Sequence, residues 1–406
     1  MKPGPKPIRR LFPILLLNLI AFAIAIPVLP ALAYAAGGTP VDVGLLYAVQ
    51  SLGQFLMAPI WGRFSDRLGR KPILLFTFLG AALLELATAF IGTLGLLYLV
   101  RFLVGLCAGN VATASALIAD STDHDNRSKS MAIIGISFAI GFTIGPFLGA
   151  MAGLAADPEL TGLQGAGLPF AMAAGINFLV FLLGFWLLVE PESNRKTRSR
   201  NRSRRVAPRT IWKQLSHKPI LLIVLVYFLY TVALTTLEGT FFVYMEAVYG
   251  YSMVEVGFIF AAMGLLMVGY HAAIGPLAKR IGDEKMTLLG ITILGVGLFF
   301  APFHPSIFYF FTLLGVATFG RAIVHPGILA MMSRQSAGSD DTGQLMGILQ
   351  SAASLARIIG PALGGLLFAS ILPSAPFFFA GGILLLSAAF WFFAAPDLRS
   401  TQHRQA

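Results

Sequence analysis

The sequence contains few charged residues. Only 12% of its 406 residues are Asp, Glu, Lys or Arg, whereas a soluble domain carries about 25%. Hydrophobic residues make up 57% of the chain, and the mean hydropathy is +0.80. Water would not keep such a chain monomeric, but a lipid bilayer would. The composition therefore excludes an ordinary soluble protein and predicts an integral membrane protein.

Cysteine is almost absent, and so are the short motifs of several catalytic classes. The single cysteine, Cys107, lies in an apolar run, which excludes an intrachain disulfide and argues against a cysteine-based metal site. The sequence has no Walker loop, no metalloprotease helix motif and no nucleophile elbow. We therefore expect neither ATP-driven transport nor hydrolysis, and no enzyme activity, cofactor or metal.

The chain instead contains twelve apolar stretches, and a helix that crosses a bilayer needs about 20 residues. Only helices and closed barrels satisfy their backbone in lipid, and continuous apolar runs of this length form helices. The first run is too long for the apolar core of a signal peptide, so we interpret it as a retained span. The prediction is an all-α membrane protein with twelve transmembrane helices, near residues 11–36, 43–61, 72–92, 94–119, 130–156, 168–189, 219–245, 253–278, 286–303, 305–332, 343–371 and 375–395.

Basic residues concentrate on one side of the predicted spans. With the N-terminus placed in the cytoplasm, 26 of the 29 Lys and Arg residues fall in inward-facing segments, and the outward loops contain none. The other three, Arg101, Arg321 and Arg357, lie inside spans. The positive-inside rule therefore predicts that both termini are cytoplasmic. The net charge of +11 follows this pattern, and we expect no nucleic-acid binding because the chain offers no reading helix or stacking platform.

Two sequence patterns recur at nearly constant offsets. GPxxG at residues 145–149 recurs 215 residues later at 360–364, and GxxxxRxG at 62–69 recurs 213 residues later at 275–282. These offsets indicate a duplicated six-helix unit. Parallel repeats of this kind place a substrate site near the bilayer midplane, where rocking of the halves exposes it to each side in turn.

The longest polar stretch, from Glu190 to Lys218, divides the two halves. Its run RKTRSRNRSRR favours a solvated linker that touches anionic headgroups, and a phosphoinositide-type lipid site is the alternative. We expect residues 1–190 to form an N-terminal six-helix bundle, residues 191–218 a basic cytoplasmic linker and residues 219–406 a C-terminal six-helix bundle.

The segment GRFSDRLGRK at residues 62–71 resembles the signature of the major facilitator superfamily between helices 2 and 3. Its chemistry suits a latch, because glycines permit a tight turn and an acid can accept hydrogen bonds from a helix N-terminus. The resemblance implies that Asp66 binds the start of helix 11 near Thr342 and Gly343, and that Arg70 pairs with Asp120. The alternative is a charged turn without a gating role. The predicted cytoplasmic gate comprises Gly62, Asp66, Arg67, Gly69, Arg70 and Asp120.

Helix 4 carries Arg101 in a pattern, RxxxGxxxG, that resembles the second motif of that family. An arginine inside a span is costly and should have a partner. Glu85 on helix 3 is the candidate, because both residues lie about 9–10 Å from the outer edge at about 1.5 Å per residue. The pair is either a fixed structural ion pair or a proton relay.

Helix 5 carries glycines spaced by four residues, at Gly141, Gly145 and Gly149, which allow another helix to approach closely. Pro146 removes a backbone donor and favours a bend. This segment resembles the motif of drug:proton antiporters, except that Ala150 stands where a second glycine is usual. Generic helix packing is the alternative explanation.

Nearly the whole chain resembles tetracycline-resistance efflux proteins. The shared-looking stretches are IPVLP (26–30), GRFSDRLGRKPILL (62–75), LYLVRFLVGLCAGN (97–110), SALIAD (115–120) and GPLAKRIG (275–282). The acid that this family carries in helix 1 is replaced by Asn18, which cannot titrate. Its helix 3 acid aligns with Leu84, beside Glu85, and its helix 9 acid has no counterpart. Proton coupling would therefore need other groups, and the candidates are Glu85 and Glu238.

Glu238 lies inside helix 7, where a carboxylate could alternate between protonated and ionised forms, recognise a cationic drug, or serve as a hydrogen-bonded structural residue. Arg321 and His325 are four residues apart on one face of helix 10 and could meet an anionic or metal-chelated substrate. Two histidines alone do not make a metal site. Other residues predicted to line a cavity, with interface or lipid-facing positions as alternatives, are Asn18, Gln50, Gln54, Asn110, Asn177, Phe241 and Arg357.

The leading hypothesis from the sequence is a proton-coupled exporter of amphipathic small molecules or drugs that works by alternating access. Glu85, Arg101 and Glu238 would carry protons or substrate charge. We expect a monomer in a bacterial cytoplasmic membrane, with a small-molecule substrate, protons and the lipid bilayer as partners. One alternative is a facilitator or importer of a metabolite, and the positive charges of Arg321 and Arg357 suit an anionic one. The other alternative is a membrane receptor or scaffold that does not transport.

Overall fold

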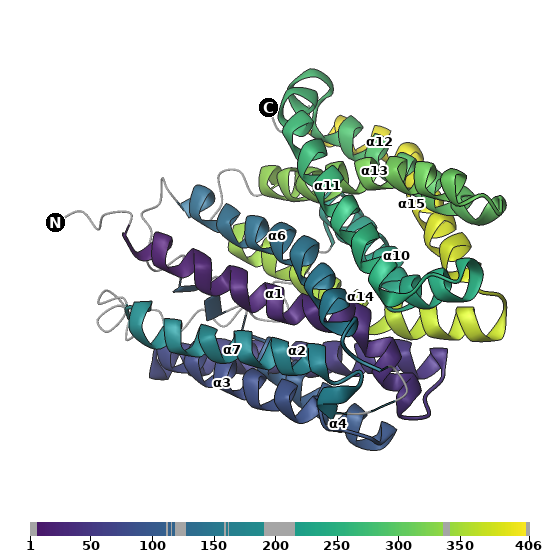
Figure 1. Ribbon diagram of the computed structural model, residues 1–406. Coiled ribbons are helices and arrows are strands. Elements are labelled where there is room, and N and C mark those ends of the chain that lie inside the picture. Colours follow the sequence, from purple (N-terminus) through teal and green to yellow (C-terminus); the bar gives the residue numbers. More distant parts are fainter. Residues whose placement is uncertain are drawn as a thin grey trace. The chain divides into compact units, whose positions relative to one another are not determined.

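The chain folds into α-helices in the part that the structure describes. A computed structural model covers residues 6–110, 113–114, 116–117, 127–157, 160, 162–190, 216–335 and 342–402. Within these residues the fold comprises twelve α-helices and no strand (Figure 1). Each helix overlaps one of the twelve predicted spans, which confirms the predicted all-α fold class.

The first six helices are α1 (Lys6–Ala35), α2 (Pro40–Leu68), α3 (Arg70–Thr88), α4 (Leu94–Ala108), α6 (Arg127–Gly153) and α7 (Leu168–Leu187). The last six are α10 (Lys218–Tyr249), α11 (Met253–Ile281), α12 (Asp283–Phe300), α13 (Ile307–Gln335), α14 (Thr342–Ser370) and α15 (Ala375–Gln402). The predicted basic linker, residues 191–218, lies outside the described residues up to residue 215.

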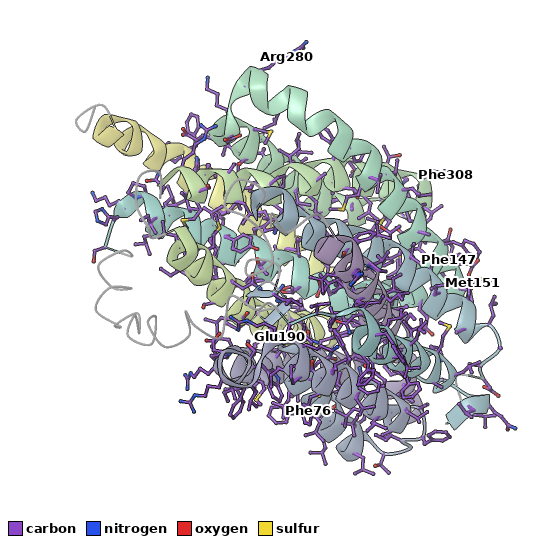
Figure 2. All side chains as sticks on the ribbon, turned by 90° about the vertical axis from the view of Figure 1, so that its left-hand side faces the viewer. Phe76, Phe147, Met151, Glu190, Arg280 and Phe308 are labelled. Atoms are coloured by element: carbon purple, nitrogen blue, oxygen red, sulfur yellow. The ribbon has the colours of Figure 1, made fainter. Side chains whose placement is uncertain are left out.

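Among the described residues, nine helices are long and apolar enough to cross a membrane, and apolar parts of α4, α6 and α11 are shorter. Several helices contain interior prolines, such as Pro146 in α6 and Pro361 in α14. Transmembrane helices tolerate proline because neighbouring groups satisfy the freed carbonyls. Large apolar side chains face outward: Phe76 is 61% exposed and Phe308 is 83% exposed (Figure 2). Such exposure suits lipid rather than water as the surrounding solvent.

Spatial proximity divides the chain into two compact units, Met1–Arg204 with Met245–Gly264 and Arg205–Tyr244 with Leu265–Ala406. In the first unit, α1 packs against α6 and α7, α2 packs against α4, and α3 packs against α4 and α7. In the second unit, α12 packs against α13 and α15, and α14 packs against α13 and α15. The α3–α7 and α3–α4 contacts thus correspond to α12–α15 and α12–α13.

The local structure repeats along with the sequence patterns. Gly69 ends α2 with φ +116°, and Gly282, which lies 213 residues later, ends α11 with φ +78°. Only glycine adopts such φ values without strain, so both turns require it. The helix starts repeat as well. Thr39 and Asp42 form a capping box at the start of α2, and Ser252 and Glu255 exchange the same reciprocal hydrogen bonds at α11.

Candidate functional site

Glu85 on α3 and Arg101 on α4 form a buried ion pair. Nη2 of Arg101 lies 2.7 Å from Oε2 of Glu85, and the side chains of Arg101 and Glu85 are 0% and 4% exposed, respectively. Nη2 also donates to Oγ1 of Thr88 at 2.9 Å, and Nη1 donates to Oε1 of Gln50 at 3.4 Å. A buried ion pair is stable only when additional hydrogen bonds satisfy its other polar atoms. The structure thus brings together three of the predicted site residues, Gln50, Glu85 and Arg101.

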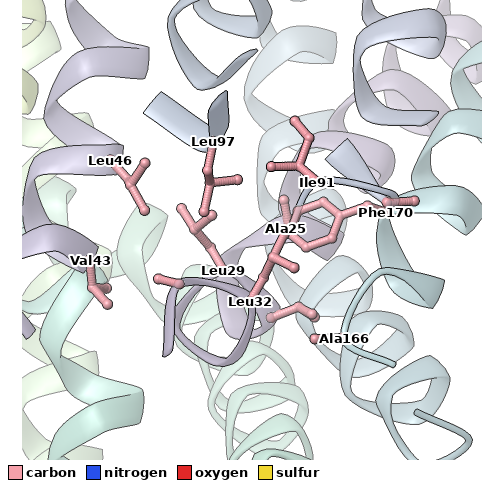
Figure 3. Close-up of a cluster of buried hydrophobic side chains, with 12 residues drawn as sticks. Ala25, Leu29, Leu32, Val43, Leu46, Ile91, Leu97, Ala166 and Phe170 are labelled. Atoms are coloured by element: carbon pink, nitrogen blue, oxygen red, sulfur yellow. The ribbon is translucent and has the colours of Figure 1, made fainter. Parts of the chain in front are cut away.

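An aromatic ring completes the surroundings of Arg101. Cζ of Arg101 lies 5.0 Å from the ring centroid of Phe170 on α7, a distance at which a cation is attracted to the ring face. Phe170 also belongs to a cluster of buried hydrophobic side chains that joins α1, α2, α4 and α7 and the loops after α3 and before α7 (Figure 3). Nε of Arg101 is buried without a hydrogen-bond partner in the described part of the chain. The guanidinium therefore connects α2, α3, α4 and α7 and keeps one unused donor.

Sequence reasoning did not identify Thr88 or Phe170 as part of this site. Thr88 lies three residues after Glu85, which places both on one face of α3, so its position was available from helical spacing. Phe170 lies far from Glu85 in sequence, at the start of another helix. Only the packing of α7 against α3 brings its ring to Arg101.

The other polar residues predicted for the first bundle form hydrogen bonds between helices. Nδ2 of Asn18 on α1 donates to Oδ1 of Asn177 on α7 at 3.0 Å. Nδ2 of Asn110 donates to Oγ1 of Thr77 at 3.2 Å, and Nε2 of Gln54 donates to the carbonyl of Ala108 at 3.3 Å. Polar side chains commonly join transmembrane helices in this way. Their part in substrate binding stays a prediction.

The predicted gate lies at the turn between α2 and α3. Nη1 of Arg70 lies 2.6 Å from Oδ1 of Asp66 and also donates to Oγ of Ser65. Gly69 is buried, whereas Asp66 and Arg67 are exposed and Gly62 is half-buried. Asp120, the expected partner of Arg70, lies outside the described residues. The side-chain surroundings of residues 342 and 343, the expected partners of Asp66, also lie outside them, so the latch stays a prediction.

One position in the corresponding turn of the second half carries the opposite charge. Asp283 begins α12 at the position that corresponds to Arg70. Its Oδ2 lies 2.6 Å from Nη2 of Arg334 at the end of α13, and the Arg334 side chain is 72% exposed. The first half was predicted to pair a basic residue on α3 with an acid after α4. The second half has an ion pair at this place with its charges exchanged.

Glu190 is a residue whose contact sequence reasoning missed. It follows the end of α7 (Figure 2), and its carboxylate accepts hydrogen bonds from the backbone N–H groups of Arg70 at 2.9 Å and Lys71 at 2.8 Å. Nζ of Lys71 donates to the carbonyl of Phe185 on α7 at 2.7 Å. A negative charge stabilises a helix N-terminus, and the first turn of α3 contains no acid of its own. The absence of an acid from the first turn of α3 was the sequence feature that could have indicated a cap from another part of the chain.

The glycines of the predicted antiporter motif face α1. A Cβ built on Gly145 would lie 2.5 Å from Cβ of Ala23, a Cβ on Gly141 would lie 2.9 Å from Cβ of Leu19, and a Cβ on Gly149 would clash with the carbonyl of Ile24. Gly141, Gly145, Pro146 and Gly149 are all buried. The helix that approaches these glycines closely is therefore α1.

Ala150 departs from the motif, and its neighbour compensates. A Cβ built on Gly257 of α11 would clash with Cβ of Ala150, so α11 supplies the small residue that α6 lacks. Met245–Gly264 belongs to the same compact unit as α6.

The repeated GPxxG pattern makes the same contact in the second unit. A Cβ built on Gly360 of α14 would clash with Oγ1 of Thr235 on α10, and one on Gly364 would clash with the carbonyl of Thr236. Oγ1 of Thr235 also donates to the carbonyl of Ala356 at 3.3 Å. The pairs α6–α1 and α14–α10 are therefore equivalent close contacts, each built on the same glycine spacing.

Charged residues of the second unit gather between α10, α13 and α14. Arg321 on α13 interacts electrostatically with Tyr230 on α10. Glu238, two turns further along α10, interacts electrostatically with both Arg321 and Arg357 on α14. Three predicted site residues, Glu238, Arg321 and Arg357, thus form one cluster.

His325 and Phe241 have different neighbours. His325 lies one turn of α13 beyond Arg321, and its Nε2 is 3.4 Å from the hydroxyl of Tyr227. Phe241 is 5% exposed, and its ring packs against those of Phe310 and Phe377 at centroid distances of 6.5 and 6.4 Å. The structure places Phe241 in an aromatic core between α10, α13 and α15, and its predicted role at a cavity stays a prediction.

The fold and these motifs define a class of protein, and comparison with known proteins identifies it. The model of the Major Facilitator Superfamily matches residues 11–282 and 271–406. The chain belongs to this superfamily, so it is an integral membrane transporter of small molecules and not an enzyme. The predicted resemblance is thereby confirmed.

Several relatives are similar over most of their length. The tetracycline resistance protein, class B, of Escherichia coli is 30% identical and covers 93% of this chain and 91% of its own. Major facilitator superfamily domain-containing protein 10 of Mus musculus is 28% identical and covers 89% of this chain and 88% of its own.

Solved structures show the same fold. The human organic anion transporter MFSD10 (TETRAN) matches with a TM-score of 0.68 at 25% identity and covers 96% of this chain and 100% of its own. An inward-facing bacterial homologue of the human lysosomal transporter Spinster matches with a TM-score of 0.79 at 16% identity, covering 97% of this chain and 98% of its own.

Proposed function

We propose that this protein is a proton-coupled exporter of amphipathic small molecules that works by alternating access. The buried ion pair between Glu85 and Arg101 is the observation that carries this proposal, since a charged pair deep in a transmembrane bundle is costly and usually functional. Similarity to tetracycline resistance proteins over more than nine-tenths of this chain and of that relative also supports export.

Protonation of Glu85 provides a physical means of coupling. The neutral carboxyl loses its charge attraction to Arg101 and can still accept a hydrogen bond, so Thr88, Gln50 and the ring of Phe170 hold a larger share of the guanidinium. The loss of one charge weakens the connection between α3 and α4 while the contact with α7 persists. A proton that enters or leaves at Glu85 would therefore change the packing within the first bundle.

The larger motion would occur between the two bundles, residues 1–190 and 219–406. The close contacts α6–α1 and α14–α10 bind these helices tightly within each bundle, which suits rigid-body rocking. The gate residues Asp66, Arg70 and Asp120 would close the cytoplasmic side. We place the protein as a monomer in a bacterial cytoplasmic membrane, with both termini in the cytoplasm.

A facilitator or importer of an anionic metabolite is the second candidate. It is supported by Arg321 and Arg357, which lie inside spans of the second bundle with Glu238 as an electrostatic partner. The similarity to human MFSD10, which is described as an organic anion transporter, also supports it.

Everted membrane vesicles with an imposed pH gradient separate these candidates. For an antiporter, added tetracycline or another amphipathic substrate should dissipate the gradient, and Glu85→Gln should abolish this effect. Glu246→Gln is the matched control, because it removes an exposed carboxylate from α10. Substrate flux without proton movement would support a facilitator, and the absence of any flux would contradict transport.

A further inference from the structure

The fourth span is interrupted before its end. The apolar stretch predicts a span near 94–119, but α4 ends at Ala108, and Gly109 and Asn110 form a turn. The N–H of Ala114 donates to the carbonyl of Asn110 at 2.9 Å, so helical hydrogen bonding begins again at Asn110. The 15 residues of α4 are about 22 Å long, whereas the hydrocarbon core is about 30 Å thick. This span therefore consists of two helical arms that meet inside the membrane.

The interruption leaves backbone carbonyls without helical partners, and α2 supplies donors to two of them. The last four carbonyls of an α-helix have no intrahelical N–H, which is costly where no water is available. Nε1 of Trp61 donates to the carbonyl of Leu106 at 2.6 Å, and Nε2 of Gln54 donates to that of Ala108 at 3.3 Å. Trp61 is 8% exposed, so its indole N–H is a buried donor. Two side chains of a neighbouring helix thus stabilise the interruption.

The turn also contacts α3 and packs closely against α2. Nδ2 of Asn110 donates to Oγ1 of Thr77 on α3 at 3.2 Å, and both residues are buried. A Cβ built on Gly109 would lie 3.0 Å from the backbone nitrogen of Ala58 and 3.2 Å from Cδ1 of Trp61. The turn therefore has specific partners on two helices, which a frayed helix end would lack.

A buried hydroxyl just beyond the turn has no hydrogen-bond partner. Thr113 is 0% exposed, and its Oγ1 forms no hydrogen bond in the part of the chain that the structure describes. A helical threonine can donate to the carbonyl four residues earlier, as Thr231 and Thr240 do at 2.8 and 2.9 Å. For Thr113 that carbonyl belongs to Gly109, which lies in the turn. A straighter helix would bring this carbonyl to Thr113, so the bent form keeps a donor that only the straighter form uses.

We propose that Gly109 and Asn110 form a hinge in the fourth span, and that Trp61 is the positioning residue that sets its angle. The inference rests on the proposed alternating-access function and names a place where the first bundle bends. A hinge inside a membrane needs backbone groups that stay paired in more than one form. The indole N–H satisfies the Leu106 carbonyl in the bent form, and the Thr113 hydroxyl gains a carbonyl in the straighter form.

The hinge connects the buried ion pair with the predicted gate. The arm before the hinge carries Arg101, which lies 2.7 Å from Glu85 on α3. The chain after the hinge continues toward Asp120, a residue of the predicted gate. When Glu85 loses its charge, the first arm is held less firmly to α3, while Asn110 still binds α3 through Thr77. The first arm then moves about the hinge. The other described side chains that contact the ion pair are neutral: Gln50, Thr88 and Phe170.

Distances between spin labels along the helix test the hinge in the full-length protein in nanodiscs. The hinge pair of labels, at Leu99 and Ala116, flanks the turn. The control pair, at Leu168 and Phe185, lies on the continuous helix α7. Both pairs are 17 residues apart, which is about 25 Å along an α-helix. The background is Cys107→Ala, so that the labels react only at the introduced cysteines.

Substitutions at Glu85 and Trp61 should change the hinge pair and leave the control pair unchanged. Glu85→Gln removes the charge of the carboxylate and should shift the distance distribution of the hinge pair. Trp61→Phe removes the indole N–H and should change the ratio of bent to straighter forms about tenfold, as expected when one buried carbonyl loses its donor. β-(3-Benzothienyl)alanine in place of Trp61 keeps the ring shape without the N–H and should have the same effect.

Trp391→Phe is the matched control. Trp391 is 2% exposed, and its Nε1 has no hydrogen-bond partner among the described residues. The substitution therefore removes a buried indole without removing a hydrogen bond of the described chain. It should leave both label pairs as in the wild type.

Three results would overturn the inference: the same hinge-pair distances in the wild type and Glu85→Gln, equal effects of Trp61→Phe and Trp391→Phe, or a parallel change in the control pair. Failure of this proposal is distinct from failure of the transport proposal. Proton-coupled flux in vesicles with fixed hinge-pair distances would remove only the hinge. Hinge motion without flux would remove only the transport function.

Discussion

Burial determines the energetic weight of the ion pairs in this protein. The pairs Glu85–Arg101 and Asp283–Arg334 have nearly the same N–O distances, 2.7 and 2.6 Å, but Arg101 is 0% exposed and Arg334 is 72% exposed. Exposed pairs contribute about 0–1 kcal/mol, whereas removal of one partner from a buried pair costs about 3–5 kcal/mol because the other charge stays uncompensated. We therefore expect the Glu85–Arg101 pair to matter far more for stability than the Asp283–Arg334 pair, although both are ion pairs of similar length.

A double-mutant cycle on each pair tests this difference. Glu85→Ala and Arg101→Ala should each lower the thermal unfolding temperature in detergent strongly, and the double variant should be less destabilised than the sum of the single variants. The cycle on Asp283→Ala and Arg334→Ala is the control and should show a coupling within about 1 kcal/mol. Additive effects at Glu85 and Arg101 would show that the buried pair does not form.

The contact between Glu85 and Arg101 could be predicted from the sequence because depth follows from residue position in a helix. Both residues lie at the same distance from the loop that joins α3 and α4. The position of Phe170 could not be predicted, since it depends on the rotation and packing of α7. Glu190 was predicted as the last residue of the first bundle, at the start of the polar stretch, because its sequence position gives no indication of the helix that it caps.

At the scale of single helices, the repeated glycines define the closest contacts. Gly360 on α14 faces Thr235, whereas Gly347 on the same helix has open space around the position of a Cβ. Both glycines occupy helix interiors, where replacement by alanine should stabilise the helix itself by about 0.5–1 kcal/mol. The two positions therefore differ only in their neighbours.

Alanine substitutions at these two glycines test the α14–α10 contact. Gly347→Ala should leave the unfolding temperature in detergent unchanged or slightly higher. Gly360→Ala should lower it, because overpacking costs about 1–3 kcal/mol, and it should also reduce the transport rate. An equal effect of the two substitutions would contradict the close packing of α14 on α10.

The start of α3 depends on a cap from another helix. Glu190→Ala removes the acceptor for the N–H groups of Arg70 and Lys71, and loss of such a cap costs about 0.5–2 kcal/mol. Hydrogen–deuterium exchange should become faster in peptides from the first turn of α3 and stay unchanged in α12. Glu246→Ala should leave both unchanged. Unaltered exchange at Arg70 and Lys71 in Glu190→Ala would show that the cap is dispensable.

The sequence predicted the helices well because each span is long, apolar and bounded by turn residues. The repeat could also be predicted, since GPxxG and GxxxxRxG recur at nearly constant offsets, and the glycines at positions 69 and 282 adopt related backbone conformations. The partners of α6 and α14 could not be predicted. A glycine face shows that some helix approaches closely, and only tertiary packing selects α1 and α10.

At the scale of the whole molecule, each half has charged residues inside its described spans. The first unit contains the Glu85–Arg101 pair, and the second contains Glu238 with Arg321 and Arg357. We assign the proton to the first and the substrate charge to the second. In this account the proton binds in one bundle and the substrate charge is recognised in the other. Proton movement is then coupled to substrate movement by motion of the two bundles relative to each other, and the account depends on that motion.

Distances between the two bundles in nanodiscs test this motion most directly. Spin labels at Pro72 and Lys285 report on the predicted cytoplasmic side, and labels at Gly95 and Phe308 report on the predicted outer side, in a Cys107→Ala background. The four positions are exposed. Between low and high pH, and with added substrate, the account predicts that one distance lengthens while the other shortens. Distances that stay fixed, or that change in the same direction, would contradict it.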